Sequence, residues 1–542
     1  MTDSRYDVIQ IGYGPVGQSL ALMLGRHGRS VAVVERWTKR YALPRAVCID
    51  HELYRVLSAN GMGEVLPDVS HRGPLYCWFN ADWKQLLVID WSAESISGGA
   101  EVNFVHQPTL EEALDRAVAA QDTVETYLGW EAISIDQDDE GTVAVLRNVD
   151  TGERKTLRAQ YIVGCDGANS VVREYVGGGR EDCGFEADWL VIDVLLKEGV
   201  TIETLGIPAA GQYCDPKRPT TIVPAGVRDG RIYRRWEFMR LPGERVEDME
   251  REERVWELLS PWAEPKEVEL VRHKVYNFQS RIARRWRERR VLLAGDAAHV
   301  MPPFMGQGMC SGLRDAWNLS WKLDLLLGGK VTDRLLESYQ PERDPHVRAL
   351  VDASIYLGKI ICIPDPLKAA DRDQAFLSGS APPRPPFPHL MDGLLKRERD
   401  GSISKGAGLL APHVRVNRQG RQGRFDDVIG LGFVVLSLDA DPESNLSPSS
   451  KSALNDLGVR FAAFGELDSP HRVIDLDGRF AAFMAPLGWK AMVIRPDFYI
   501  YGGVGETVAL NELVMALVAD IHGCTAPKHN EAAGRISEAR TW

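Results

Sequence analysis

The stretch 5-RYDVIQIGYGPVGQSLALMLGRHGRSVAVVE-35 decides the fold of the first part of the chain. A short apolar run at 6–12 is followed by an apolar-rich helical pattern at 15–27 and by a valine-rich run at 30–35. This order within about 30 residues predicts a β-α-β unit. Because a crossover helix joins the two strands, we expect them to pair in parallel.

A Gly-x-Gly-x-x-Gly motif formed by Gly12, Gly14 and Gly17 follows the first predicted strand directly. The first glycine allows a tight turn, the second lets a pyrophosphate approach the backbone, and the third lets helix and strand pack closely. The predicted helix begins at Pro15 and Val16, and the free N–H groups at a helix N-terminus favour an anion. Although a chance turn can produce such spacing, the strand and helix on either side favour dinucleotide binding.

The second predicted strand ends at Glu35, about 20 residues beyond the glycines, where a carboxylate can accept a hydrogen bond from a ribose 2′-hydroxyl. Arg36 follows it and is a further candidate for the cofactor site. An acidic residue there disfavours a 2′-phosphate. The site is therefore expected to bind FAD or NAD rather than NADP.

Two further short apolar runs, at 161–164 and 291–294, each lead into a Gly and Asp signal. The segments are GCDGANSVVR (164–173) and RRVLLAGDAAHVMPPFMGQGMCSGLRDAWNLSWKL (289–323). Both runs predict buried strands. Ligands of open α/β sheets lie beyond the carboxyl ends of the strands, so three such loops can converge on one site.

The rest of the chain divides by pattern. Residues 181–284 alternate polar and apolar, which predicts antiparallel sheet, and SGSAPPRPPFPH (378–389) marks a boundary. Predicted strands at 433–439, 459–465 and 490–496 then alternate with helical patterns. The expected fold is α/β, or α+β overall, with four parts: a discontinuous dinucleotide-binding domain (1–75, 105–180 and 285–362), an inserted antiparallel-sheet substrate domain (76–104 and 181–284), a linker (363–389) and a C-terminal domain (390–542).

Composition limits the function. The 542 residues are 44% hydrophobic and 26% charged, which is typical of a globular protein, and the net charge of -12 argues against nucleic-acid binding. No run is long enough to span a membrane, and the N-terminus lacks a signal-peptide pattern. The eight cysteines contain no Cys-x-x-Cys pair, so we expect free thiols, no metal site and a reducing, cytoplasmic location.

The three motifs, in this order, resemble the p-hydroxybenzoate hydroxylase-like flavoprotein monooxygenases. In that family FAD binds the glycine loop, and the aspartate of the Gly-Asp motif, here Asp296, contacts the ribityl chain. Asp166 and Gly167 match an Asp-Gly motif associated with FAD and NAD(P)H, and Arg173 follows it. The resemblance and the loop of 301–312 together imply these further cofactor contacts: Arg45, Gln107, Pro303, Gly306, Gly308 and Met309.

A narrower resemblance covers nearly the whole chain. The segments CDPKRP (214–219) and RRWEFMRLPGE (234–244) look like those of 3-(3-hydroxyphenyl)propionate hydroxylases of bacterial aromatic degradation. The C-terminal domain looks like the thioredoxin-like appendage of phenol hydroxylase relatives. Its single cysteine, Cys524, cannot form a redox pair within it. Cys310 stands where the family has Asn, and a thiol is a weak hydrogen-bonding group.

The resemblance implies an EC 1.14.13-type reaction in which NAD(P)H and O2 hydroxylate a phenolic ring through a flavin C4a-hydroperoxide. Because a phenolate is attacked more readily than a phenol, a residue must bind or deprotonate the ring hydroxyl. Candidates are Asp50, which lies five residues after Arg45, and then His51 and Tyr213, with Tyr233 weighed beside them. His299 is expected to be structural.

A phenolic acid such as 3-(3-hydroxyphenyl)propionate needs a partner for its carboxylate, and arginine binds carboxylates with two parallel hydrogen bonds. Arg235 is the first candidate and Arg218 the second, although either could be a solvated charge. Strand alternation places Arg235 on one face with Glu237, and Arg234 and Arg240 on the other.

Three alternatives stay open at this stage: a hydroxylase of simple phenols or aromatic polyketides, an FAD-dependent reductase without oxygen insertion, and a flavin-binding protein without activity. Expected partners are a small phenolic substrate and O2, with no nucleic acid and no membrane, and a homodimer is one assembly left open.

Overall fold

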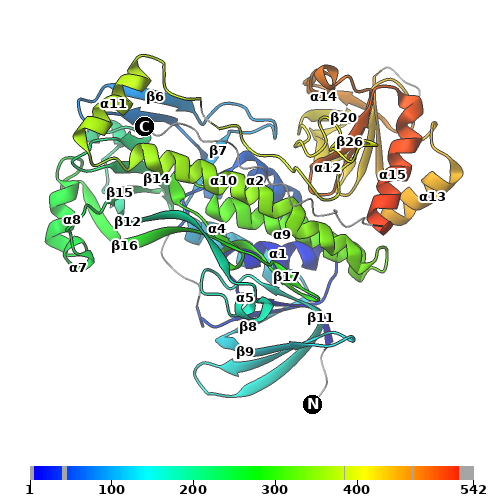
Figure 1. Cartoon of the computed structure of the whole chain (residues 1–542), viewed down its shortest axis with the longest axis horizontal. Coiled ribbons are helices and arrows are strands. Elements are labelled where there is room, and N and C mark those ends of the chain that lie inside the picture. The colour runs from blue at the N-terminus through cyan, green and yellow to red at the C-terminus, as the bar shows by residue number, and fades with distance from the viewer. Residues whose placement is uncertain (1–4, 40–44, 384, 466–468, 524–542) are drawn as a thin grey trace.

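The structure is a computed structural model, and it describes residues 5–39, 45–383, 385–465 and 469–523 (Figure 1). Cys524 lies outside the described residues. The other seven cysteines are free thiols. No helix among the described residues is long and apolar enough to cross a membrane. The described residues also contain no group of three or more His, Cys, Asp or Glu placed to hold a metal ion.

The expected β-α-β unit is present as β1 (Arg5–Ile11), α1 (Pro15–Arg26) and β2 (Val31–Glu35), with the two strands parallel. The sheet runs in the order β17-β18-β11-β1-β2-β8, and β9 and β10 continue from β11. Residues 31–34 are all buried, as is typical of a parallel strand covered on both faces. The other strands are β8 (Val124–Leu128), β9 (Trp130–Gln137), β10 (Thr142–Asn148), β11 (Arg154–Gly164), β17 (Arg287–Glu288) and β18 (Val291–Leu293).

A second sheet has the order β19-β16-β12-β15-β14-β13-β5-β6. Its pairs are antiparallel, as the alternation predicted, except that β13 and β5 are parallel. The strands are β5 (Leu75–Phe79), β6 (Gln85–Asp90), β12 (Arg180–Leu196), β13 (Ala210–Tyr213), β14 (Thr220–Arg228), β15 (Arg231–Met239), β16 (Val268–Ala283) and β19 (His299–Val300). One face packs with α7 (Val246–Met249) and α8 (Glu252–Leu259).

A small sheet has the order β3 (Cys48–Asp50), β7 (Val102–Val105), β4 (Ser70–Arg72). Along the sequence, its strands are interspersed with strands of the two large sheets. Two long helices, α9 (Gly308–Leu327) and α10 (Tyr339–Ile361), run side by side across the molecule (Figure 1). Helix α9 also packs against α1. Other helices of this part are α2 (His51–Leu57), α4 (Gln107–Ala119) and α5 (Val171–Val176).

The segment expected to be a linker contains a helix, α11 (Pro366–Leu377). Asp365 caps it by accepting hydrogen bonds from the amides of Leu367 and Lys368, and proline occupies the first helical position. Arg372 in this helix is buried and donates to the carbonyl oxygen of Cys214. The segment is therefore part of the packed structure, next to β6.

The C-terminal domain has the thioredoxin-like order β23-β22-β25-β26, in which β22 and β23 are parallel and β25 and β26 are antiparallel. It comprises β20 (Arg415–Arg418), β21 (Arg421–Arg424), α12 (Phe425–Ile429), β22 (Val434–Ser437), α13 (Pro448–Leu457), β23 (Arg460–Phe464), β24 (Arg472–Asp475), α14 (Arg479–Met484), β25 (Ala491–Ile494), β26 (Ile500–Val504) and α15 (Leu510–Gly523). The expected fold class is confirmed.

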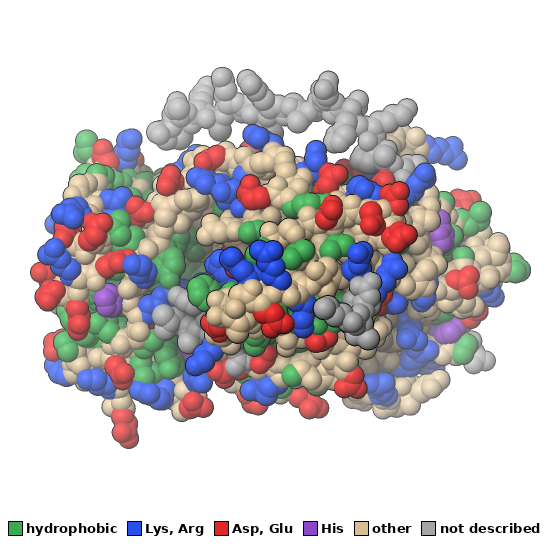
Figure 2. All heavy atoms as spheres, turned by 90° about the horizontal axis from the view of Figure 1, so that it is seen from below, with side chains coloured by type: hydrophobic (Ala, Val, Ile, Leu, Met, Phe, Trp, Pro, Cys, Tyr) green, Lys and Arg blue, Asp and Glu red, His purple; other side chains and the backbone are tan. Residues whose placement is uncertain are grey.

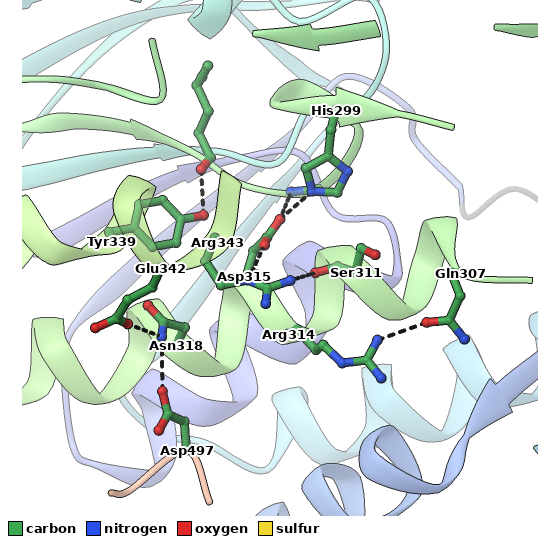
Figure 3. Close-up of polar contacts among 12 residues, drawn as sticks. His299, Gln307, Ser311, Arg314, Asp315, Asn318, Tyr339, Glu342, Arg343 and Asp497 are labelled. Carbon is green, nitrogen blue, oxygen red and sulfur yellow. Dashed lines mark hydrogen bonds and ion pairs between the residues drawn. The ribbon is translucent and has the colours of Figure 1, made fainter. Parts of the chain in front are cut away.

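Charged side chains of both signs are interspersed over the face seen in Figure 2. A group of buried charged side chains joins the C-terminal domain to α9 and α10. Arg495 donates to Glu342 on α10, which also accepts from Lys322 and Asn318 on α9. Asp497 accepts from Arg495 and from Asn318, as Figure 3 shows for the second bond.

We expect Glu342→Gln to destabilise the protein, because it leaves the buried cations Lys322 and Arg495 without their shared carboxylate. Breaking a buried ion pair from one side typically costs about 3–5 kcal/mol. Thermal unfolding followed by circular dichroism should show a midpoint lower by about 3–4 °C, because the unfolding entropy of a chain of this length makes each kcal/mol worth about 1 °C. The control is Glu337→Gln, since Glu337 is exposed. Equal midpoints for the two variants would show that this junction adds little stability.

Candidate active site

The three motif loops meet at the carboxyl edge of the first sheet, because β18, β11 and β1 are neighbours there. The amide of Cys165 donates to the Ile11 carbonyl oxygen at 2.7 Å. A Cβ atom on Gly12 would lie 2.3 Å from the Cys165 carbonyl oxygen, and one on Gly312 would lie 2.5 Å from Cγ2 of Val16. Glycine at these two positions is therefore what allows the loops to approach one another.

The glycine loop has the shape of an anion cradle. A Cβ atom on Gly14 would meet no protein atom within 4 Å, so open space lies beside this residue, whereas one on Gly17 would lie 2.3 Å from the Gly12 carbonyl oxygen. Gly14 is the N-cap of α1 and supplies no side-chain cap, which leaves the first-turn N–H groups after Pro15 available. The residues present thus fit the pyrophosphate of a dinucleotide.

Glu35 holds the glycine loop in place. Its carboxylate accepts from the amide of Tyr13 at 2.8 Å and from that of Trp37 at 3.0 Å. The guanidinium of Arg36 stacks on the ring of Trp37, 5.0 Å from its centroid. A ribose contact of Glu35 stays a prediction, and the geometry adds a role in shaping the loop.

Asp296 presents an exposed carboxylate that has no hydrogen-bond or ion-pair partner among the described residues. The preceding residue is fixed by Asp315 on α9, whose carboxylate accepts from the Gly295 amide at 3.0 Å. Asp315 also bonds to His299 at 2.6 Å and to Arg343 at 2.8 Å (Figure 3).

His299 is buried and bonded to Asp315, which supports the expected structural role.

The Asp-Gly motif of Asp166 and Gly167 is held by the start of α5. Asp166 accepts from the Ser170 hydroxyl and from the first amides of α5, so its carboxylate caps that helix. Arg173 donates to the carbonyl oxygens of Ala168 and Ala297 and thereby ties this loop to the loop of Asp296. At Gly167 (φ +78°) a Cβ atom would meet nothing within 4 Å.

A cavity of about 240 Å³ lies between the loop of 301–309, the segment of 45–50 and the second sheet. Its apolar walls come from Val47, Cys48, Trp91, Val102, Phe104, Val223, Met301, Pro303, Phe304, Met305 and Met309. Its polar groups come from Arg45, Asp50, Tyr76, Gln212, Thr221, Arg235, Glu237 and Gln307. Gly306 and Gly308 complete the rim at the start of α9.

Gln107 fixes the start of the segment of 45–50 that lines the cavity. Its side-chain oxygen accepts hydrogen bonds from the amide of Arg45 at 3.0 Å and from that of Ala46. The Arg45 carbonyl oxygen accepts in turn from Arg235. Both residues predicted from the resemblance therefore lie beside the cavity, and their contacts with a cofactor stay a prediction.

Asp50 lines the cavity and caps α2, where it accepts from the Leu53 amide at 3.1 Å. Its other oxygen accepts from Arg314 on α9. Burial raises the pKa of the Asp50 carboxyl, but the guanidinium of Arg314, the nearby His51 and the Leu53 amide together outweigh burial and leave that pKa below the ordinary value. Asp50 is thus a carboxylate that accepts hydrogen bonds readily and takes up a proton poorly.

His51 and Tyr213 do not line the cavity. The ring of His51 bonds to Ser97 at 3.0 Å and faces a separate cleft. Tyr213 donates to the Ala81 carbonyl oxygen and packs on Trp83, while its neighbour Gln212 points into the cavity. Successive side chains of a strand point to opposite faces, so β13 can present only one of the pair. Tyr233, the fourth candidate, stacks on His106 instead.

Of the two arginines expected to bind a substrate carboxylate, Arg235 lines the cavity and Arg218 does not. Arg218 is bonded to Glu244 and to the Met239 carbonyl oxygen. Arg235 makes a two-point contact with the fully buried Asp193, at 2.7 and 3.0 Å. Asp193 therefore already occupies two of the N–H donors of Arg235.

Sequence reasoning missed several groups that shape the site. Arg314 donates to Glu52 at 2.6 Å and to Gln307 at 3.0 Å, so it joins the cavity loop to α2 (Figure 3). The adjacent charges Arg314 and Asp315 inside an otherwise apolar helical pattern are the signal that could have found them. No local signal marks Tyr76, because it reaches the site through the β5–β13 pairing.

We expect Gly14→Leu to abolish FAD binding and to leave the fold intact. The leucine side chain would enter space that holds no protein atoms, where the pyrophosphate is expected to bind. The matched control is Gly99→Leu, since a Cβ atom there also meets nothing within 4 Å. Flavin content per protein, read from the absorption spectrum after gel filtration, checks this. Wild-type flavin content in the Gly14 variant would remove the glycine loop from the cofactor site.

We also expect Asp296→Ala to weaken FAD binding by about 10- to 100-fold, the value of a charged hydrogen bond. Cys310→Ala should change it little, because this thiol is buried and faces the Cys48 carbonyl oxygen at 4.0 Å. Dissociation constants from flavin fluorescence titration of the apoproteins decide between the two. Equal losses in the two variants would mean that the loop of Cys310 contributes to FAD binding through its side chain.

Comparison with known proteins agrees with this geometry. Residues 5–354 match the family model described as FAD binding domain, and residues 408–520 match the one described as HcaD C-terminal domain. A probable NADH-specific resorcinol 4-hydroxylase of Rhodococcus jostii is 36% identical, over 95% of both chains. A 3-(3-hydroxy-phenyl)propionate/3-hydroxycinnamic acid hydroxylase of Comamonas testosteroni is 31% identical, over 91% of this chain and 93% of the other.

Solved structures share the fold. Aklavinone-11 hydroxylase, solved with FAD and aklavinone, superposes with a TM-score of 0.77 at 24% identity, covering 96% of this chain and 100% of the other. The flavin-dependent monooxygenase PieE gives a TM-score of 0.79 at 21% identity, over 96% and 99% of the two chains. With the matched family model and the relatives above 30% identity, these findings show that the chain belongs to the FAD-binding aromatic hydroxylases, which are flavin-dependent monooxygenases.

Proposed function

We propose that the protein hydroxylates a small, uncharged phenol of the resorcinol type, with NADH as the electron donor. The observation that carries the proposal is the two-point ion pair of Arg235 with Asp193, together with a second carboxyl group, Glu237, in the same wall. A substrate carboxylate here would compete with Asp193 and lie beside Glu237. Burying an anion next to like charge is costly, whereas a hydroxyl group meets acceptors.

The size of the cavity supports a small substrate. Its volume of about 240 Å³ lies below the roughly 300–1,000 Å³ usual for ligand pockets. The walls that face a ring are aromatic and sulfur-containing, with Trp91, Phe104 and Met309 among them. These features favour one ring with short substituents over a ring with an extended side chain.

When bound, FAD supplies the redox chemistry that activates O2 at the expense of the nicotinamide. The chain itself holds the ring and excludes water. Asp50 accepts a hydrogen bond from one ring hydroxyl, which shifts electron density into the ring and favours attack at a ring carbon. Arg314 keeps the Asp50 carboxylate ionised and oriented, and Gln307 in the cavity loop is bonded to the same guanidinium.

Two further points support the proposal. The Rhodococcus jostii relative, which is 36% identical, is described as NADH-specific and as acting on resorcinol. All seven described cysteines are free thiols, in keeping with a cytoplasmic enzyme.

A second candidate substrate is 3-(3-hydroxyphenyl)propionate, which the sequence resemblance favoured. The observation in its favour is that the guanidinium of Arg235 lines the cavity at all. It would require a substrate carboxylate to share that guanidinium with Asp193.

A substrate panel tests the proposal. The purified holoenzyme should oxidise NADH faster with resorcinol than with 3-(3-hydroxyphenyl)propionate, and kcat/KM should favour resorcinol at least about tenfold, the value of one hydrogen bond of 1.4 kcal/mol. Hydroxylated product should match NADH consumed. The neutral control is 3-propylphenol, which has the length of the acid without its charge. A preference for the acid over 3-propylphenol would favour the second candidate and contradict the first.

A further inference from the structure

Glu237 is a buried carboxyl group on the wall of the cavity. It lies on β15, only 8% of its surface is exposed, and it lines the cavity. Within the described residues no hydrogen bond to its carboxyl is present, and the nearest cationic atom, Nη1 of Arg235, is 3.8 Å away, which is too long for one. A buried polar group without a partner is unfavourable, so a ligand is the natural partner for this group.

The neighbouring polar groups on the same wall are already engaged. The Gln212 side chain donates to the Tyr76 hydroxyl at 2.7 Å and accepts from the Thr221 hydroxyl at 2.8 Å. Thr221 lies directly across from Glu237 in the β14–β15 register, yet its hydroxyl is turned to Gln212. Glu237 is thus left to face the cavity.

A purely structural role for Glu237 as counter-charge to Arg235 fits the distances poorly. Asp193 already meets that guanidinium at 2.7 and 3.0 Å, and it lies across from Arg235 in the β12–β15 register. Asp193 also lies 4.0 Å from the buried Arg272, so Glu237 adds a second negative charge to a group with two arginines, but at 3.8 Å from Arg235 its oxygens make no hydrogen bond to that guanidinium.

We propose that Glu237 recognises the second ring hydroxyl of the substrate and so sets the preference for a dihydroxybenzene over a monohydric phenol. This inference rests on the proposed function. Asp50 comes from the β3–α2 junction and Glu237 from the second sheet, so the two carboxyl groups approach the cavity from different elements. A ring with two hydroxyl groups offers one hydrogen bond to each, whereas phenol offers only one.

The chemistry of the group suits a neutral hydroxyl. Burial raises the pKa of Glu237 above its ordinary value despite the nearby Arg235. As a carboxylate it accepts a hydrogen bond from the hydroxyl, and as a carboxylic acid it can also donate one. A substrate that lacks the hydroxyl leaves this carboxyl desolvated and unpaired, and sites built in this way discriminate strongly against such analogues.

The test compares resorcinol with phenol in the FAD-bound enzyme. Glu237→Met keeps the side-chain length and removes hydrogen bonding, while Glu237→Gln keeps an amide that can donate and accept. Equilibrium binding is measured from the change in the flavin absorption spectrum, and kcat/KM from NADH oxidation with product analysis. We expect the resorcinol-to-phenol affinity ratio to fall about tenfold in the Met variant and less in the Gln variant. Phenol binding should not weaken in the Met variant, because methionine removes the carboxyl that phenol leaves unpaired.

Glu186→Gln is the control, because Glu186 is an exposed residue of the adjacent strand β12. Its ratio should equal that of the wild type. An unchanged ratio in every Glu237 variant that folds and binds FAD overturns the inference, provided that the wild type prefers resorcinol. A wild type with no preference for resorcinol over phenol or 3-propylphenol instead contradicts the proposed function, so the two failures are distinguishable.

Discussion

The packing of α9 against the rest of the molecule is the constraint on which the other parts depend. Its start forms the rim of the cavity at Gly308, and Gly312 allows α1 and the loop of Gly295 to come within van der Waals contact. The adjacent residues Arg314 and Asp315 of this helix contact different parts of the site. Arg314 holds Asp50 and Glu52, and Asp315 holds the loop that carries Asp296. One helix therefore sets the distance between the cofactor loops and the substrate cavity.

The same helix explains the C-terminal domain. That domain has a thioredoxin-like sheet but no cysteine within its described residues, and its contribution to the site is physical support. Tyr499 donates to Glu52 at 2.8 Å, and Glu52 is the partner of Arg314. Buried charges are tolerated only when each is matched, so the fold of α9 and α10 requires the acceptors and donors that this domain supplies. Arg55, which bonds to Asp426, repeats the pattern at α2.

Sequence patterns predicted the parts of the fold that depend on residues close together in the chain. The β-α-β unit, the convergence of three loops and the antiparallel second sheet all follow from spacing and alternation. Alternation also placed Arg235 and Glu237 on one face correctly, since both line the cavity. It could not say which of Gln212 and Tyr213 faces inward, because that depends on the parallel pairing of β13 with β5, more than 100 residues earlier in the chain. The partners of Arg314 were out of reach for the same reason, because Asp50 and Glu52 precede it by more than 250 residues.

Sheet register also decides what an arginine in the cavity can do. The residue type suggested a partner for a substrate carboxylate, but β12 places Asp193 directly across from Arg235, and opposite charges across an antiparallel pair attract each other. The arginine thereby becomes part of the framework. Two residues further along β15, the side chain points the same way but has no such partner, because its cross-strand neighbour on β12 is Val191. A shift of the register by two residues in either direction would take Asp193 away from Arg235 and leave the guanidinium without this cross-strand partner. The charge that the cavity presents to a substrate is therefore a property of the strand pairing, and the resemblance of a sequence segment to that of an acid hydroxylase does not fix it.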